Sequence, residues 1–288
     1  MTKESVAAFD KAIDSLRNLA LTALLTLHID IRCGSIHMVS QSLSSGNNSN
    51  SNRTSEAPPT SPIPTTSDQS WVHILNTQPT SASPGILELN NDLIAFHATV
   101  SSYLGHAECL FITSGLARLI DRAFVSATRF IGAMNSNGAL RLQLDVLVLQ
   151  QNLKNIITDA PVSKVGKQRN STTTPTTTTN IIAVNNTHDI VALPRSAKFL
   201  DYFLDGADRA ISYAKEEKEL FQSMGRAKAL QAGNGEPFTY DEMKVLVELC
   251  FSSTLGVPGG DENREDFMAA KRRHGDALLK LSEVMWDS

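Results

Sequence analysis

The histidine and cysteine side chains are the groups in this chain best suited to metal binding or catalysis. Cys33 and His37 lie four residues apart, so they would share one face of a helix. His97 and Ser101 have the same spacing. A metal centre in a helical bundle, however, commonly uses Glu-x-x-His motifs on facing helices, and no glutamate here is followed by histidine at that distance. We therefore interpret both pairs, and His28 in its apolar surroundings, as packed or solvent-facing side chains.

Glycine-rich and nucleophile motifs lack their essential parts. The turn Gly233-Asn234-Gly235 and the run VPGGDE have neither the preceding strand nor the following lysine that a phosphate-binding loop requires. No serine occupies a Gly-x-Ser-x-Gly elbow. The sequence thus predicts no catalytic, cofactor-binding or metal-binding residue, and we expect a protein that is not an enzyme and that uses no cofactor.

The overall charge and the cysteine content limit the classes of partner. The 288 residues contain 26 Lys and Arg against 30 Asp and Glu, which gives a net charge of −4. Proteins that neutralise nucleic-acid phosphates usually carry a basic excess, so we expect no nucleic-acid partner. The three cysteines, Cys33, Cys109 and Cys250, form no Cys-x-x-Cys pair. This favours a reducing compartment over a disulfide-rich secreted scaffold.

Neither a membrane span nor a lipid-binding patch is expected. The most apolar early segment, residues 19–31, is shorter than the ~20 residues of a spanning helix. The leader before it is acidic, whereas a signal peptide begins with a basic region. The charged runs at residues 215–219 and 271–274 are typical of solvated helix faces, and acidic neighbours of the second run favour a mixed-charge surface over lipid binding. We therefore expect a cytoplasmic protein.

Two segments of low complexity divide the chain. Residues 42–85 are rich in Ser, Thr, Asn and Pro, and residues 159–196 contain a Thr-rich tract. Neither segment buries enough apolar surface to offset its chain entropy, so we expect both to be disordered. A small apolar island at residues 71–75 of the first segment is either a docking segment or a loop that folds back.

Both segments contain dipeptides that a proline-directed kinase recognises. A phosphate there would add negative charge without disturbing a core. Segments of this composition also produce such dipeptides by chance, and both interpretations stay open for Ser61-Pro62, Ser83-Pro84 and Thr174-Pro175.

Apolar residues recur at intervals of three and four outside these segments, which is typical of helices. This pattern predicts helices over residues 6–31, 86–103, 112–134, 139–158 and 200–224, and two more that end near residues 255 and 286. A stop and turn is expected at residues 135–138. The helix over residues 139–158 is apolar on two faces, so we expect it at the centre of a bundle.

The best-specified local structure is a capping box. In the sequence Thr239-Tyr240-Asp241-Glu242, the Thr239 side chain can accept a hydrogen bond from the Glu242 amide while the Glu242 side chain reaches back. Phe238 and Met243 have the spacing of a hydrophobic staple. No segment alternates in the manner of a strand. The predicted class is all-α, with stacked antiparallel bundles formed by residues 1–41 with 86–158 and by residues 197–288.

Several blocks of sequence also resemble a known family. In order along the chain they read LRNLALTALLTLHIDIRC, LELNNDLIAF, LFITSGLARLI and MNSNGALRLQLDVLVLQQNLKNI. The stretch LVLQQNLKNI at residues 147–156 is the most specific, and FTYDEMKVLVEL at residues 238–249 is similar to the family's last block. The blocks cover residues 16–37, 86–157 and 198–250. They resemble the C-terminal part of exocyst complex component four, the Sec-eight subunit of the exocyst.

This resemblance implies a non-enzymatic part of a tethering-complex rod. The family acts in a complex that holds secretory vesicles at the plasma membrane before SNARE-mediated fusion. The implied partners are other exocyst subunits, small GTPases and the SNARE machinery, with a cytoplasmic protein recruited peripherally to sites of exocytosis through the complex.

Two further interpretations stay open. The family's long N-terminal part, including its coiled coil, has no counterpart in this sequence, so we expect a fragment, a gene-model artefact or a truncated paralogue. In the last case the chain would be a stand-alone helical adaptor regulated through its Ser/Thr/Pro linkers. The third hypothesis, a helical metalloenzyme, is supported only by Cys33, His37 and scattered histidines.

Overall fold

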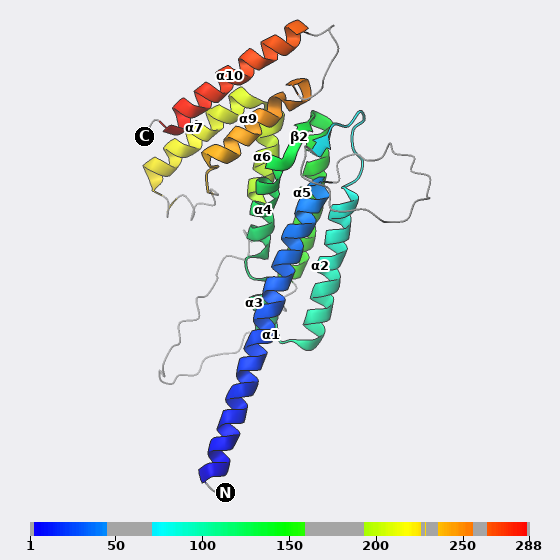
Figure 1. Ribbon diagram of the computed structural model, residues 1–288, viewed down its shortest axis with the longest axis vertical. Coiled ribbons are helices and arrows are strands. Elements are labelled where there is room, and N and C mark those ends of the chain that lie inside the picture. Colours follow the sequence, from blue (N-terminus) through cyan, green and yellow to red (C-terminus); the bar gives the residue numbers. More distant parts are fainter. Residues whose placement is uncertain are drawn as a thin grey trace, which may run out of the picture.

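Helices make up nearly all of the computed structural model, and a short pair of strands joins them (Figure 1). The structure describes residues 3–44, 71–158, 193–225, 228, 236–255 and 264–286. In chain order the elements are α1 (Lys3–Ser44), β1 (Trp71–His73), α2 (Pro84–Tyr103), α3 (His106–Thr113), α4 (Leu116–Ala127), the 3-10 turn η1 (Thr128–Phe130), β2 (Ile131–Met134), α5 (Ser136–Thr158), α6 (Pro194–Asp205), α7 (Ala207–Met224), α9 (Tyr240–Leu255) and α10 (Arg264–Trp286). The predicted all-α class is confirmed.

The helices form an elongated body with a second group across one end. The C-terminal part of α1 runs beside α2 and α4, and α5 packs between α2 and α6 (Figure 1). Helices α7, α9 and α10 lie against one another, and α6 connects them to α4 and α5. The N-terminal part of α1 projects beyond the other helices.

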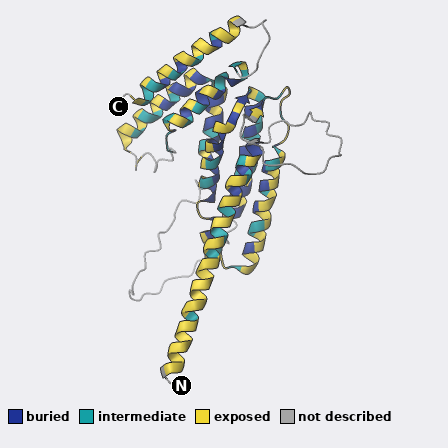
Figure 2. Cartoon of the chain, in the orientation of Figure 1, coloured by how far each residue is buried: buried dark blue, intermediate teal, exposed yellow. Residues whose placement is uncertain are grey.

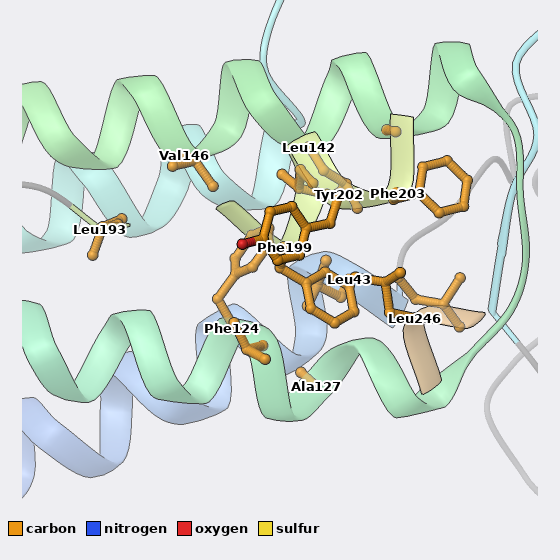
Figure 3. Packing of buried hydrophobic residues seen from close by; sticks show 14 of the residues in the cluster. Leu43, Phe124, Ala127, Leu142, Val146, Leu193, Phe199, Tyr202, Phe203 and Leu246 are labelled. Atoms are coloured by element: carbon orange, nitrogen blue, oxygen red, sulfur yellow. The ribbon is translucent and has the colours of Figure 1, made fainter. Parts of the chain in front are cut away.

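One apolar cluster runs through both groups of helices, from Val39 on α1 to Leu281 on α10. At its centre Phe124 of α4 and Phe199 of α6 are fully buried. Leu43 of α1 and Leu246 of α9 approach the same point (Figure 3). Four helices that are distant in sequence therefore share one core, and α6 is the element common to both groups.

Helix α5 has one buried apolar face and a second apolar face that the described residues cover only in part. The stripe of Leu142, Val146, Leu149, Leu153 and Ile156 is buried throughout. The other stripe is only partly covered, and Leu147 within it is 57% exposed. Among the described residues, α5 therefore packs between α2 and α6 through its first stripe, and its second stripe is covered only in part.

The prediction of a single helix over residues 112–134 is wrong, because this range contains the end of α3, then α4, η1 and β2. Gly115 takes a left-handed conformation with φ +68° and separates α3 from α4. After α4 the chain becomes the strand β2, which pairs in parallel with β1, so that His73 lies opposite Met134. The N–H of Met134 also donates to Ser252 Oγ of α9 at 2.9 Å. These partners are distant in sequence, so local periodicity did not reveal them.

The apolar island at residues 71–75 is thus a segment that folds back. It begins with β1, and its end is held by Asn135, whose side chain donates to the Leu75 carbonyl at 2.8 Å and accepts from the Leu75 N–H at 3.2 Å. Of the two ranges predicted to be disordered, residues 42–44, 71–85 and 193–196 belong to the described structure, whereas residues 45–70 and 159–192 lie outside the described residues.

The expected helix over residues 200–224 is two helices. Gly206 separates α6 from α7 with φ +91° and ψ 165°. Residues with a side chain rarely adopt a positive φ of this size, so a glycine allows this break where other residues would favour continuation. The apolar periodicity continues across the break, because Leu200, Phe203, Ala207 and Ile211 all enter the same core.

The capping box is confirmed. The Thr239 N–H donates to Glu242 Oε2 at 2.8 Å, and the Glu242 N–H donates to Thr239 Oγ1 at 3.3 Å. Phe238 and Met243 on either side of the cap are buried. All four residues lie within six positions of sequence, so the sequence alone specifies this structure.

The first turn of α5 leaves no space for a side chain at Gly138. A Cβ built there would lie 1.9 Å from the His73 carbonyl oxygen, because β1 crosses this turn directly. We expect Gly138→Ala to lower the free energy of unfolding by about 2 kcal/mol or more, since overpacking against backbone commonly costs about 1–3 kcal/mol. Gly275→Ala in α10 is the control, because a Cβ there meets nothing within 4 Å. It should raise stability by about 0.5–1 kcal/mol. Equal effects of the two changes in chemical denaturation would contradict this packing.

Candidate protein interface

The residues considered as ligands or catalysts do not come together. Among the residues that the structure describes, no group of three or more His, Cys, Asp or Glu side chains could hold a metal ion. Cys33 and His37 are exposed on α1. On α2, His97 is half-buried and the Ser101 hydroxyl is bonded to the Ala98 carbonyl at 3.3 Å. The prediction that the chain has no catalytic or metal site stays a prediction.

His28 connects α1 to the end of α3. Its Nδ1 lies 3.1 Å from the carbonyl oxygens of both Phe111 and Ile112, and its ring stacks on Phe111 with centroids 5.0 Å apart. Arg32, one turn further along α1, donates to the Ser114 carbonyl. Carbonyls in the last turn of a helix have no partner within the helix, so side chains that donate to them are stabilising. His28 is thus a packed side chain.

The projecting part of α1 presents apolar side chains to solvent. These side chains lie on more than one side of the helix, and we call them together the α1 outer face. They are 43–67% exposed, and they are Val6, Phe9, Leu16, Leu19, Leu21, Leu25 and Ile29 (Figure 2). The predicted stripe on this helix meets other helices only in its C-terminal part, since Ile31 packs against the core whereas Phe9 and Leu16 do not. Exposed apolar patches of this extent typically mark sites of interaction.

The hydroxyl groups on this part of α1 would cost little free energy to bury. The hydroxyls of Ser15, Thr22 and Thr26 donate to carbonyls one turn earlier in their own helix, at 2.8–2.9 Å. A hydroxyl that is already bonded leaves no unpaired donor when water is removed. The α1 outer face is therefore suited to contact with another apolar surface.

By length and composition α1 could cross a membrane, because it contains a window of mean hydropathy 1.4 that is 6% buried. Core helices of soluble proteins and signal sequences meet the same criterion. Here His28 and Arg32 attach the second half of α1 to α3, and Arg17 is charged and exposed. The free, uncharged stretch is residues 18–27, which is about half of the ~20 residues that a span requires. We interpret α1 as a surface for protein contact.

Two buried carboxylates attach the segments that begin after the long connections. Asp121 of α4 accepts from the N–H of Ser196 at 2.8 Å, from its hydroxyl at 2.6 Å, and from the N–H of Arg195 at 3.1 Å. The N-cap of α6 is Leu193, whose side chain cannot accept a hydrogen bond. Asp121 therefore caps α6 from another helix. Burial raises the pKa of Asp121, although the donors of Ser196 and Arg195 oppose that rise.

Asp145 of α5 serves the start of α2 in the same way. It accepts from the N–H of Ser83 at 2.6 Å and from the Ser83 hydroxyl at 2.9 Å. The residue is 1% exposed, and this burial raises the pKa of Asp145 to about 6. The bonds from Ser83 and the positive charge of Arg141 act in the opposite direction. The desolvation cost is therefore only partly offset.

The side chain of Arg195 joins α6 to the start of α9. It donates to the Glu236 carbonyl at 2.6 Å and to the Glu242 carboxylate, which belongs to the capping box. Its guanidinium also lies 4.6 Å from the centroid of the Phe238 ring. The first turn of α6 is thus fixed by its backbone on one side and by its side chain on the other.

The charged run at residues 215–219 is only partly a solvated face. Glu217 forms an ion pair with Lys198 and accepts from the Tyr202 hydroxyl at 2.8 Å. Lys218 donates to the carbonyls of Val284 and Met285 at 3.0 and 3.2 Å, at the C-terminal end of α10. This corrects the prediction for these two residues. In the second run, residues 271–273 are exposed, as predicted.

Sequence reasoning did not identify Asp121, Asp145 or Arg195. One signal was present for the two aspartates, since each shares a helix face with apolar residues three or four positions away, Ala117 and Phe124 for Asp121 and Leu142 and Leu149 for Asp145. A buried carboxylate needs partners. The partners lie on segments 62 to 75 residues away, so the sequence did not show which helix start each one serves.

Removing the Asp121 carboxylate should destabilise the fold. Asp121→Ala leaves buried N–H donors of α6 without acceptors, and we expect a loss of about 2–4 kcal/mol in the free energy of unfolding. Asp92→Ala, at an exposed position of α2, should change stability by less than about 0.5 kcal/mol. Urea denaturation of both variants tests this, and similar midpoints for the two would show that Asp121 does not hold α6.

The raised pKa of Asp145 makes stability depend on pH. The unfolded chain ionises this group at its ordinary value of 3.8, whereas the folded chain does so at about 6. As pH rises from 4 to 6, the folded state therefore loses up to about 3 kcal/mol from this group, and the loss stays constant above that range. Burial lowers the pKa of His73, which acts in the opposite direction as pH falls.

Asp145→Asn isolates the contribution of this carboxyl, because His73 is unchanged in the variant. We expect Asp145→Asn to gain stability relative to the native chain as pH rises from 4 to 7. Unfolding in urea at several pH values measures this difference. A difference between the two chains that does not vary with pH would contradict the burial of an ionised Asp145.

Comparison with known proteins gives sequence relatives from one family. No family model matches the chain. A probable exocyst complex component sec8 from Neurospora crassa is 32% identical over 310 aligned residues, which cover 100% of this chain. Exocyst complex component 4 of Dictyostelium discoideum is 43% identical over 72 residues, 25% of this chain and 6% of that protein. The human protein of the same name is 20% identical over 156 residues, 54% of this chain and 14% of that protein.

The chain spans less than a quarter of the length of these relatives, since the aligned region is 23% of the Neurospora protein. The similarity to the Neurospora protein nevertheless includes the whole of this chain, helices and connections together. In the region that it spans, the chain therefore belongs to the family of exocyst complex component four, the Sec8 subunit.

Proposed function

We propose that the chain is a non-enzymatic helical part of the exocyst and that it binds another subunit of that complex through the α1 outer face. The observation that carries the proposal is the combination of family membership with an apolar helix surface that no other described element covers. The surface lies at one end of an elongated body (Figure 1). That is where a rod-like assembly would continue.

The details of the proposal follow the resemblance. The complex would hold secretory vesicles at the plasma membrane before SNARE-mediated fusion, and small GTPases and the SNARE machinery would act with it. The chain would be cytoplasmic and would reach sites of exocytosis peripherally, through the complex. The net charge of −4 supports protein partners over nucleic acid.

A second candidate is a stand-alone helical adaptor that is regulated through its Ser/Thr/Pro linkers. The contiguous core favours it, because buried residues on α1, α2, α4, α5, α6, α7, α9 and α10 form one cluster without any contribution from another chain. Such an adaptor would bind partners outside the exocyst.

Affinity purification of the tagged chain from its own cells, followed by mass spectrometry, separates the two candidates. We expect the native chain to recover other exocyst subunits. The double variant Leu16→Asn, Leu19→Asn should reduce that recovery at least tenfold, because both side chains are about two-thirds exposed and central to the α1 outer face. Exposed positions tolerate such changes with little effect on folding.

Leu279→Asn on α10 is the matched control, since Leu279 is 65% exposed and α10 lies at the end of the body opposite the N-terminal part of α1 (Figure 1). Recovery should be unchanged in this variant. A folded native chain that recovers no exocyst subunit would reject the proposal and favour the adaptor. Equal loss in both variants would show that binding does not use the α1 outer face.

A further inference from the structure

One of the three Ser/Thr-Pro dipeptides, Ser83-Pro84, lies in the described part of the chain. It stands at the start of α2, where Ser83 contacts Asp145 of α5. Ser83 precedes the first turn of α2 with an extended backbone, φ −67° and ψ 145°. Its hydroxyl makes no capping bond within α2, because it donates to Asp145 Oδ2 at 2.9 Å. The N–H of the same residue donates to Asp145 Oδ1 at 2.6 Å. A single serine thus supplies both of the donors that the buried carboxylate binds.

The space around this contact is small. Ser83 and Asp145 line a cavity of about 20 Å³ together with Ser42, His73 and Arg141. A volume of this size holds about one water molecule. The helices also approach closely beside it, since a Cβ on Gly85 would lie 2.6 Å from Ser42 Oγ. A phosphoryl group on the Ser83 oxygen could therefore not take the place of the hydroxyl hydrogen in the contact with Asp145.

The charges around the contact also disfavour a phosphate. A phosphate dianion on Ser83 would lie beside the Asp145 carboxylate, in a site where one carboxylate is already incompletely compensated. Arg141 is the positive group at this cavity, and one guanidinium cannot balance a carboxylate and a dianion. Like charges at this separation repel strongly when water is excluded.

We propose that Ser83 is a phosphorylation site for a proline-directed Ser/Thr kinase, and that its phosphate releases residues 76–83 from α5. In the transfer step, Ser83 Oγ attacks the γ-phosphorus of ATP. The Oγ–P bond forms as the bond from the γ-phosphorus to the β,γ-bridging oxygen breaks, ADP leaves with that oxygen, and the hydroxyl proton passes to the catalytic base of the kinase.

The segment has the features of a kinase substrate. Pro84 directly follows Ser83 and is exposed, as are most residues from Asn76 to Ser81. The hydroxyl itself becomes available when the segment opens, and local openings of short segments with few buried side chains need far less free energy than global unfolding. Phosphorylation would then prevent closure.

The release would have a defined extent. β1 is a three-residue strand that pairs with β2 alone, and beyond it the segment is held mainly by Asn135 at Leu75 and by Asp145 at Ser83. Loss of the contact between Ser83 and Asp145 leaves residues 76–83 attached only at their two ends, by Leu75 on one side and by α2 on the other. The buried face of α2 begins at Ile86, so the helix itself should stay in place.

The test begins with phosphorylation of the full chain by a proline-directed kinase and ATP, with sites located by mass spectrometry. A synthetic peptide of residues 78–88 is the reference substrate. We expect modification of both at Ser83 and no modification of the peptide that carries Ser83→Ala. An unmodified peptide, or a modified peptide with an unmodified chain, would overturn the proposal.

Hydrogen exchange then measures the release. In the chain phosphorylated at Ser83, amides of residues 76–83, including the Ser83 N–H that donates to Asp145, should exchange at least tenfold faster, while those of β1 and α5 keep their protection. Ser83→Glu should show the same change in part, whereas Ser81→Glu, at an exposed position two residues earlier, should not. Unchanged exchange in the phosphorylated chain would overturn the proposal.

Asp145→Asn distinguishes charge repulsion from simple loss of the hydroxyl contact. With a neutral side chain at this position, phosphorylation should accelerate exchange severalfold less than it does in the native chain. An equal acceleration in both would reject Asp145 as the cause of release. These measurements need no other exocyst subunit, so their outcome is independent of the function proposed above.

Discussion

The first turn of a helix needs acceptors for its N–H groups, and this requirement shapes the whole fold. Helices α2 and α6 both begin after long connections, and neither has a local cap: Leu193 has no acceptor, and the Ser83 hydroxyl turns away from its own helix. Asp145 and Asp121 supply the acceptors from α5 and α4. Each aspartate thereby determines where a segment returns to the core, at the cost of burying a carboxylate.

The apolar pattern of α1 serves two different environments. From Ile31 onward it packs against the core, and His28 and Arg32 mark the place where the helix leaves α3. Before that point the same kind of side chain is exposed (Figure 2). A single continuous helix therefore has apolar side chains both in the core and on the part that projects beyond the other helices. This is the feature that connects the fold to an assembly.

How far sequence reasoning succeeded depended on the distance between partners. The capping box at Thr239 and Glu242 was predictable because both residues lie in one turn. The helical class followed from apolar periodicity. The strand β2 was not predictable, because its partner β1 lies about 60 residues away and the apolar spacing of Ile131 and Met134 also suits a helix. Val6, Phe9 and Leu16 of the α1 outer face belong to the predicted apolar stripe, but their exposure was not predicted, since periodicity does not show whether a neighbour is present. Leu19, Leu21, Leu25 and Ile29 lie outside that stripe.

The parallel pairing of β1 with β2 also has a consequence for the order of folding. Helices α2, α3 and α4 all lie between the two strands in sequence, so the pairing closes a loop that contains them. Closing so long a loop carries an entropic cost that only the folded intervening helices reduce. We therefore expect β1 to join late on the folding pathway. During synthesis, the strand would wait unpaired until the chain had been extended as far as β2.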